Sequence, residues 1–151
     1  MRNLHLTALA ALVALAALAP SVAAAQDKII PVEVSHTGKD PVGQNIVSHL
    51  KEKIRATRRL KLVQGVDAPR MKMVLTSVTS GDSRDPEASS ALATAFVYDD
   101  PTVPIDGALI LTHVYDCGRD RAESCAQRLL SILDRQISYL QEKWPNLYKK
   151  L

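Results

Sequence analysis

The side chains of this chain that could do chemistry are few, and the histidines come first. Beyond residue 25 there are three, His36, His49 and His113. None falls in a His-Glu-x-x-His pattern or at a spacing typical of zinc ligands. The chain also lacks a Gly-x-Ser-x-Gly nucleophile elbow, a phosphate-binding glycine loop and a dinucleotide fingerprint. We therefore expect no metal, no cofactor and no catalytic residue that a sequence motif can identify.

A catalytic site can still be assembled from distant residues, because such residues gather only in the folded chain. His113 with Asp116 and a serine is one such arrangement, and it defines the hypothesis of a small exported hydrolase. Pairs of aspartates also occur in predicted turns, where aspartate caps backbone N–H groups or binds calcium weakly. We favour turn chemistry for these pairs, which are Asp82 with Asp85 and Asp99 with Asp100.

A basic segment is the sharpest chemical feature. Between residues 51 and 61, six cations face one acid, Glu52; the cations are Lys51, Lys53, Arg55, Arg58, Arg59 and Lys61. The dipole of a helix favours cations near its carboxyl end, which is a purely structural explanation. The same cluster is a possible patch for anionic lipid, lipopolysaccharide or an acidic partner. A net charge of +3 and 4% aromatic residues do not indicate a nucleic-acid partner.

The first 25 residues have the features of an export signal. Arg2 precedes an apolar run from Leu6 to Ala19, and Ala23-Ala24-Ala25 forms a small-residue cleavage site. The run is shorter than the roughly 20 residues that span a bilayer as a helix. We expect cleavage near Ala25. Because no cysteine lies near that point to accept a lipid, we expect a periplasmic or secreted product. The predicted domains are a signal peptide at 1–25 and one α+β domain at 26–151.

Both cysteines, Cys117 and Cys125, lie late in the chain. An even cysteine count in an exported protein favours a structural disulfide. If they are joined, Cys117 faces the helix that follows, and alternation places Leu109, Leu111, His113 and Tyr115 on the same side of their strand. The alternate residues of that strand, Ala108, Ile110, Thr112 and Val114, then lie on the uncovered side of the sheet. Residues of the neighbouring strands extend this open and rather apolar face: Val74, Val78, Ala93, Ala95 and Val97.

Hydrophobic periodicity supplies the elements that must position these residues. It predicts strands over 28–34, 60–64, 70–79, 90–98 and 108–117, and helices from 41 to about 57 and from 120 to about 143. Asp40 is expected to cap the first helix, and Asp120 and Glu123 to form a capping box for the second. Pro31 indicates that the first strand lies at an edge or a bulge.

These elements predict an α+β fold. Two helices pack on one face of a mixed, mainly antiparallel sheet of about five strands, in the order β-α-β-β-β-β-α. The first crossover makes its flanking strands parallel, and the later short connections favour antiparallel pairing.

Residues 28–63, including DPVGQNIVSHLKEKIRATRRLKLV at 40–63, resemble the opening strand-helix-strand unit of bacterial envelope-assembly domains. These are the amino-terminal domain of the Tol-Pal translocation protein, the curli-secretion lipoprotein and the lipopolysaccharide-assembly lipoprotein, whose anchoring cysteine this chain lacks. Asp40-Pro41-Val42-Gly43-Gln44 and the segment Cys117 to Ala126 (Cys-Gly-x-x-Arg-x-x-x-Cys-Ala) are similar to small exported bacterial proteins with no assigned role. The second resemblance implies a shared fold and disulfide, and no activity.

The leading hypothesis is a non-catalytic periplasmic or secreted protein that binds another cell-envelope component through the open sheet face or the basic segment. The alternatives are the small exported hydrolase and an anionic-lipid or lipopolysaccharide binder that uses residues 51–61. We expect a protein or other envelope partner, no nucleic acid, and no transmembrane segment in the mature chain.

Overall fold

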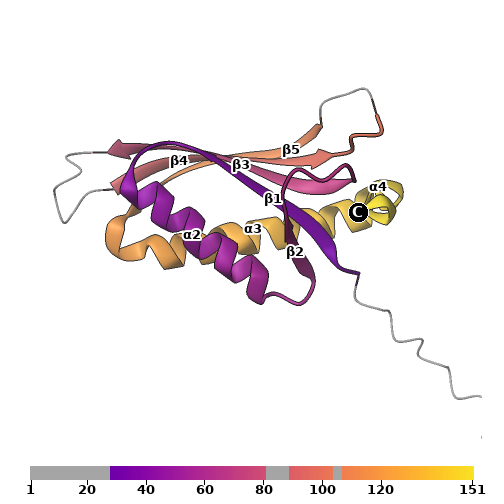
Figure 1. The fold of residues 1–151 in the computed structure, drawn as a ribbon, viewed down its shortest axis with the longest axis horizontal. Coiled ribbons are helices and arrows are strands. Elements are labelled where there is room, and N and C mark those ends of the chain that lie inside the picture. Colours follow the sequence, from indigo (N-terminus) through magenta and orange to yellow (C-terminus); the bar gives the residue numbers. More distant parts are fainter. Residues whose placement is uncertain (1–27, 81–88, 104–106) are drawn as a thin grey trace, which may run out of the picture.

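The computed structural model describes residues 28–80, 89–103 and 107–151. The predicted signal peptide and the pair Asp82 and Asp85 therefore lie outside the described residues. The described elements, shown in Figure 1, are β1 (Ile30–Thr37), α2 (Pro41–Ala56), β2 (Leu60–Val63), β3 (Arg70–Ser80), β4 (Ser89–Asp99), β5 (Ala108–Gly118), the 3-10 turn η2 (Arg119–Arg121), α3 (Ala122–Lys143) and α4 (Pro145–Lys150).

The five strands form one mixed sheet in the spatial order β2-β1-β3-β4-β5. β1 is parallel to both β2 and β3, whereas β3-β4 and β4-β5 are antiparallel. Figure 1 shows α2 and α3 on the same side of this sheet. The predicted α+β class, the element order and the parallel first crossover are all confirmed, and η2 and α4 are short additions.

Two predictions about strand neighbours are wrong. The second and third strands are not an antiparallel pair, because β1 lies between β2 and β3 and all three run parallel. Pro31 does not mark an edge strand, since β1 is internal. Ile30 directs its N–H to the β2 side, so the nitrogen of Pro31 faces β3. The missing N–H costs nothing there, because β3 begins to pair with β1 only at Val32, opposite Met71.

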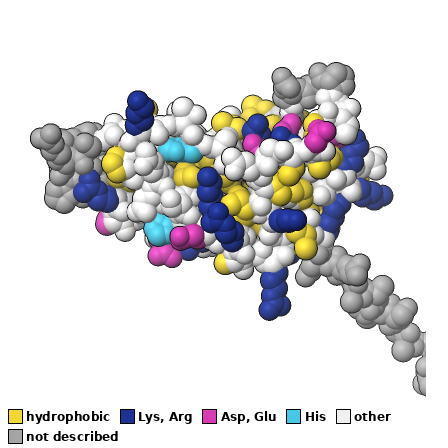
Figure 2. All heavy atoms as spheres, viewed as in Figure 1, with side chains coloured by type: hydrophobic (Ala, Val, Ile, Leu, Met, Phe, Trp, Pro, Cys, Tyr) yellow, Lys and Arg dark blue, Asp and Glu magenta, His cyan; other side chains and the backbone are white. Residues whose placement is uncertain are grey.

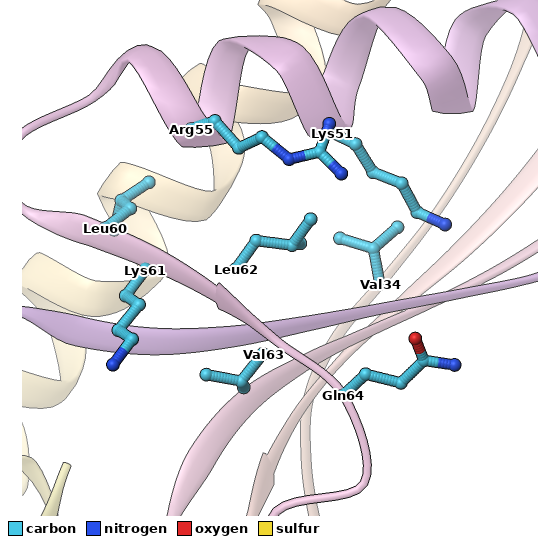
Figure 3. Close-up of a pocket in the computed structure, with 8 residues that line it drawn as sticks. All are labelled: Val34, Lys51, Arg55, Leu60, Lys61, Leu62, Val63 and Gln64. Carbon is cyan, nitrogen blue, oxygen red and sulfur yellow. The ribbon is translucent and has the colours of Figure 1, made fainter.

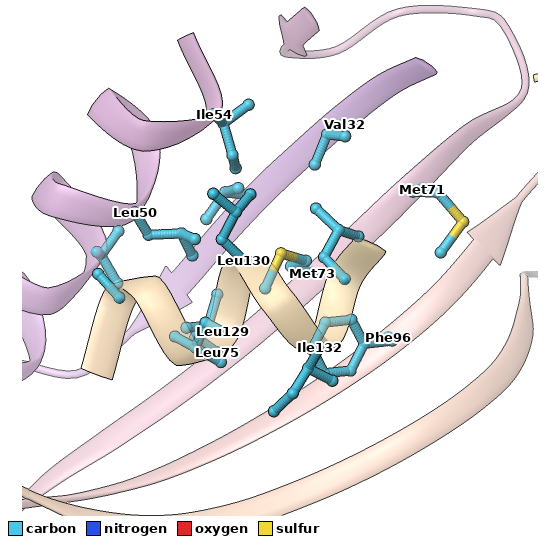
Figure 4. Packing of buried hydrophobic residues seen from close by; sticks show 14 of the residues in the cluster. Val32, Leu50, Ile54, Met71, Met73, Leu75, Phe96, Leu129, Leu130 and Ile132 are labelled. Carbon is cyan, nitrogen blue, oxygen red and sulfur yellow. The ribbon is translucent and has the colours of Figure 1, made fainter. Parts of the chain in front are cut away.

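The core fills the space between the helices and one face of the sheet. Figure 4 shows Leu50 and Ile54 of α2 and Leu129 of α3 packed over the strands. The buried positions recur at helical spacing in α2 and α3 and at every second residue in β1, β3 and β4. The largest completely covered side chains include Phe96, Met71, Met73, Leu75, Leu92, Ile132 and Leu133.

The opposite face of the sheet is exposed, as predicted, and carries Val78 (60% exposed) and Val114 (70% exposed). The prediction for Leu109 is wrong, because its side chain is 62% exposed. The register jumps from Phe96 opposite Leu111 to Val97 opposite Leu109, so that Ile110 is an extra residue in β5. This bulge inverts the alternation, and Ile110, expected on the open face, packs against the core.

The second helix begins differently from the prediction. Gly118 leads into the 3-10 turn η2, and the residue that caps α3 is Arg121, which makes no side-chain capping hydrogen bond. Asp120 and Glu123 therefore do not form a capping box. Glu123 instead pairs with Lys53 of α2, Nζ to Oε1 at 3.0 Å, and so links the two helices.

A disulfide joins Cys117 at the end of β5 to Cys125 in the first turn of α3. Cys117 is 1% exposed and faces the core, as the sequence predicts. The bond therefore closes the corner at which the chain leaves the sheet and enters α3.

We expect replacement of both cysteines, Cys117→Ala with Cys125→Ala, to lower the free energy of unfolding by about 2–3 kcal/mol, because the unfolded chain loses a short covalent loop. Chemical denaturation without reductant measures the change. Dithiothreitol should destabilise the unaltered protein by a similar amount and leave the double variant unchanged. An equal midpoint for the oxidised and reduced protein would contradict the assignment.

Candidate functional site

A pocket of about 470 Å³ lies between the carboxyl-terminal half of α2 and the edge strand β2. Three of its lining side chains are cations: Lys51 and Arg55 come from α2, one turn apart, and Lys61 comes from β2. Figure 3 shows Lys51 and Arg55 reaching from the helix toward Val34 and Leu62. The remaining lining residues are Val34, Leu60, Leu62, Val63 and Gln64. We call this site the basic pocket.

The strand geometry explains how the basic pocket combines charge with an apolar floor. Leu60 and Leu62 share one face of β2, whereas Lys61 alternates to the other face. The pocket therefore wraps around the outer edge of the sheet. No carboxylate lines it among the described residues, and Lys51, Arg55 and Lys61 make no ion pair with any described residue. The site can hold a group that is anionic at one end and apolar beside it.

The structure divides the six predicted cations into two sets. Lys51, Arg55 and Lys61 all line the basic pocket, the first two together from α2 and Lys61 from the other face of β2. Lys53 points to α3 and pairs with Glu123, whereas Arg58 and Arg59 lie in the connection between α2 and β2. The apolar and amide lining residues were not predicted, because only the parallel pairing of β1 with β2 brings Val34 and Leu62 to the same place.

Figure 2 shows the same region as a surface. Lys and Arg side chains lie among exposed hydrophobic side chains over α2 and β2, and the acidic side chains lie toward the margins of this face.

The hydrolase arrangement named from the sequence does not assemble. His113 faces the core side of β5, where its ring packs edge-on against Tyr115 at 5.8 Å between centroids. Asp116 lies on the opposite, exposed face and accepts a hydrogen bond from Ser89. Three residues apart on a strand, His113 and Asp116 cannot share a site. His49 lies on the flank of α2, as predicted, with Nδ1 3.6 Å from Glu52 Oε2.

A different His-Ser-Asp cluster does form, and no sequence pattern predicts it. His36 Nε2 lies 2.8 Å from Ser77 Oγ, and Ser77 Oγ donates to Asp40 Oδ2. A hydroxyl has a single proton, so His36 must donate to Ser77 if Ser77 donates to Asp40. Asp40 Oδ1 also accepts from the backbone N–H of Gly43 at 2.6 Å, which is the predicted cap of the first helix. We call these residues the Asp40 clamp.

The Asp40 clamp is not arranged for nucleophilic catalysis. Ser77 is 3% exposed, and the backbones of Gly38 and Gly43 press against its side chain. Burial by itself would raise the pKa of Asp40, but the hydrogen bonds from Ser77 and Gly43, together with smaller effects of Ser90 and His36, hold the pKa below its usual value. A carboxylate with a lowered pKa is a weak general base. The clamp instead fixes the start of α2 against β1 and β3.

The remaining predicted acids have structural roles. Asp100 accepts from the backbone N–H of Thr102 at 3.0 Å and from Lys150 Nζ at 2.8 Å, and the bond from Lys150 is the main reason its pKa falls to about 2. Turn chemistry is thus confirmed for Asp100, while Asp99 pairs with Arg70. Within the described residues, no group of three or more His, Cys, Asp or Glu side chains is placed to hold a metal ion.

This chain has structural neighbours of low sequence identity. No family profile and no curated protein sequence matches this chain. Solved structures similar to it include rare lipoprotein B from Shewanella oneidensis (13% identity, 74% of this chain and 99% of that one, TM-score 0.41) and a minor lipoprotein from Acinetobacter baumannii (15%, 74% and 94%, 0.37). A hypothetical protein from Chlamydia trachomatis is also similar (9%, 59% and 71%, 0.34).

Two of these three neighbours are lipoproteins, the class named in the weaker of the two sequence resemblances. The resemblance through Cys117 to Ala126 remains an expectation. Among the described residues, no helix combines the length and apolar character needed to cross a membrane.

The close packing at Gly43 predicts the effect of adding a side chain there. Alanine favours a helix over glycine by about 1 kcal/mol, but a Cβ at Gly43 would overlap the side chain of Ser77. We expect Gly43→Ala to lower the free energy of unfolding by about 1–3 kcal/mol, because the clamp must shift. Asn45→Ala, at an exposed position two residues later, is the control and should not destabilise. A gain in stability for Gly43→Ala by chemical denaturation would refute this account.

Protonation of Asp40 at low pH should also weaken the Asp40 clamp. Because the pKa of Asp40 is lower in the folded chain than in the unfolded chain, its contribution is complete above about pH 4 and is lost as the pH falls through the folded value. Asp40→Asn keeps a capping side chain but has no titratable group. We expect its free energy of unfolding to fall less between pH 5 and pH 2 than that of the unaltered protein. Asp134→Asn, exposed on α3, should keep the original slope, and equal slopes for all three proteins would exclude this role for Asp40.

Proposed function

We propose that this chain is an exported, non-catalytic protein that binds a negatively charged component of the cell envelope in the basic pocket. The observation that carries the proposal is the pair Lys51 and Arg55 above an apolar floor, with Lys61 on the adjoining strand; none of the three has an acidic partner among the described residues. Arg55 and Lys61 are exposed and Lys51 is half-buried, so the three charges are accessible, and like charges gathered in one place attract a ligand of opposite charge. The dipole of α2 accounts for cations in its last turn, such as Arg55, but not for Lys61 on a separate strand.

Export is supported by residues 1–25, which have the pattern of a signal peptide, and by the disulfide, which is typical of oxidising compartments. A periplasmic or secreted location would place the basic pocket among anionic lipids, lipopolysaccharide and acidic envelope proteins. Each of these offers negative charge beside apolar or extended groups. The proposal therefore names an anionic envelope ligand and a binding role.

Photocrosslinking in living cells tests this proposal without prior choice of the ligand. With Gln64 of the pocket replaced by p-benzoylphenylalanine, irradiation should give a covalent adduct with an envelope component. Adding Lys51→Glu and Arg55→Glu should reduce the adduct by roughly tenfold, because two attractive charges become repulsive. Mass analysis of the adduct separates a lipid from a protein.

The matched controls use Arg135, an exposed cation on α3 that forms no ion pair with the described residues. The photocrosslinker at this position should give no comparable adduct, and Arg135→Glu should leave the adduct at Gln64 unchanged. The proposal would be ruled out if the adduct at Gln64 survived Lys51→Glu combined with Arg55→Glu. It would also be ruled out if the folded, exported protein gave no adduct at Gln64.

A further inference from the structure

The sheet is incomplete beside the basic pocket. β2 pairs with β1 only from Ile30 to Glu33, whereas β1 continues to Thr37 and pairs with β3 along that whole stretch. The last four residues of β1 therefore have a strand on one side only. Such an edge presents backbone donors and acceptors that another chain can pair with.

The direction of the backbone groups identifies the open positions. The N–H of Ile30 donates to the carbonyl of Arg59 at 2.8 Å, so Ile30 is directed toward the β2 side. In an extended strand successive residues point their N–H and C=O groups alternately to the two neighbours, so His36 is also directed to that side. β2 has ended before this level, at Val63, which lies opposite Glu33. The N–H and C=O of His36 thus face the side without a strand.

The edge is held in place and lies next to positive charge. The ring of His36 is bonded to Ser77 in the Asp40 clamp, which fixes the end of β1 before any partner arrives. Val34, two residues earlier, is part of the basic pocket, and Lys51 and Arg55 extend over it (Figure 3). A strand added beside His36 would place every second side chain on the α2 side, within the reach of these cations.

We propose that an extended acidic segment of a partner protein adds to the sheet at this edge and takes the position beside β1 that β2 leaves vacant. Its backbone pairs with His36, and carboxylates on alternate residues meet Lys51 and Arg55. This inference rests on the proposed function and names its ligand as a polypeptide. A lipid supplies negative charge but has no row of N–H and C=O groups to match the strand edge.

The test uses a fluorescent eight-residue peptide of alternating glutamate and valine, titrated at low salt into the protein as purified from its secreting host. We expect saturable binding by anisotropy. A peptoid with the same side chains but no backbone N–H should bind about tenfold more weakly, because the paired hydrogen bonds are lost. Lys51→Glu with Arg55→Glu should weaken peptide binding by a similar factor, and Arg135→Glu should not.

Amide hydrogen exchange by NMR separates strand addition from simple charge attraction. At saturating peptide the amide of His36 should exchange at least about tenfold more slowly, while the amide of Ser35, directed to β3, should not change. Equal binding of peptide and peptoid, or no protection of His36, would overturn strand addition and leave the proposed function standing. If the protein bound phosphatidylglycerol vesicles but not the peptide, strand addition would likewise be overturned, and the proposed function would stand. If neither probe binds and the crosslink at Gln64 is also absent, both proposals fail.

Discussion

The buried carboxylate of Asp40 holds the helical layer and the sheet together at one end of the molecule. It caps α2 through Gly43 and accepts from Ser77 of β3, which in turn contacts His36 at the end of β1. The start of α2, the end of the preceding strand β1 and the more distant strand β3 therefore meet at one anionic group that is 5% exposed. Since α2 rises by 1.5 Å per residue, the position of its first turn determines where Arg55 lies, about 18 Å further along. The geometry of the basic pocket thus depends on the clamp at the opposite end of the helix.

The same clamp explains why Asp40-Pro41-Val42-Gly43 is a recognisable segment. Asp40 caps the helix, Pro41 occupies a position where no N–H is needed, Val42 enters the core, and Gly43 leaves room for Ser77. Of these four roles, only that of Gly43 is visible solely in the folded chain. A glycine inside a helix is unfavourable on local grounds, and here a long-range contact requires it.

Local periodicity predicted the elements and the class of the fold, because it depends only on neighbouring residues. The failures all involve longer-range contacts. Leu109 was assigned to the wrong face because one extra residue, Ile110, disturbs the register with β4. Glu123 was expected to cap its own helix, but the cation of Lys53 on α2 is within 3.0 Å. The charges of the basic pocket could be found in the sequence, whereas Val34 and Gln64 could not, since no local pattern reveals which strand lies beside another.

The loop that follows β2 is held by hydrogen bonds from Arg70, and this keeps the edge beside His36 open. Arg70 donates to the carbonyl of Val66 at 2.7 Å and to that of Ala68 at 3.1 Å, both within this loop. The same guanidinium pairs with Glu33 of β1 and Asp99 of β4, at 2.6 Å each, and is 11% exposed. Moving the loop to lengthen β2 would take both carbonyl acceptors away from Nη1 of this covered guanidinium, which opposes the movement. Arg70 therefore stabilises the loop in the position where β2 ends after four residues and the last part of β1 has no strand on the β2 side.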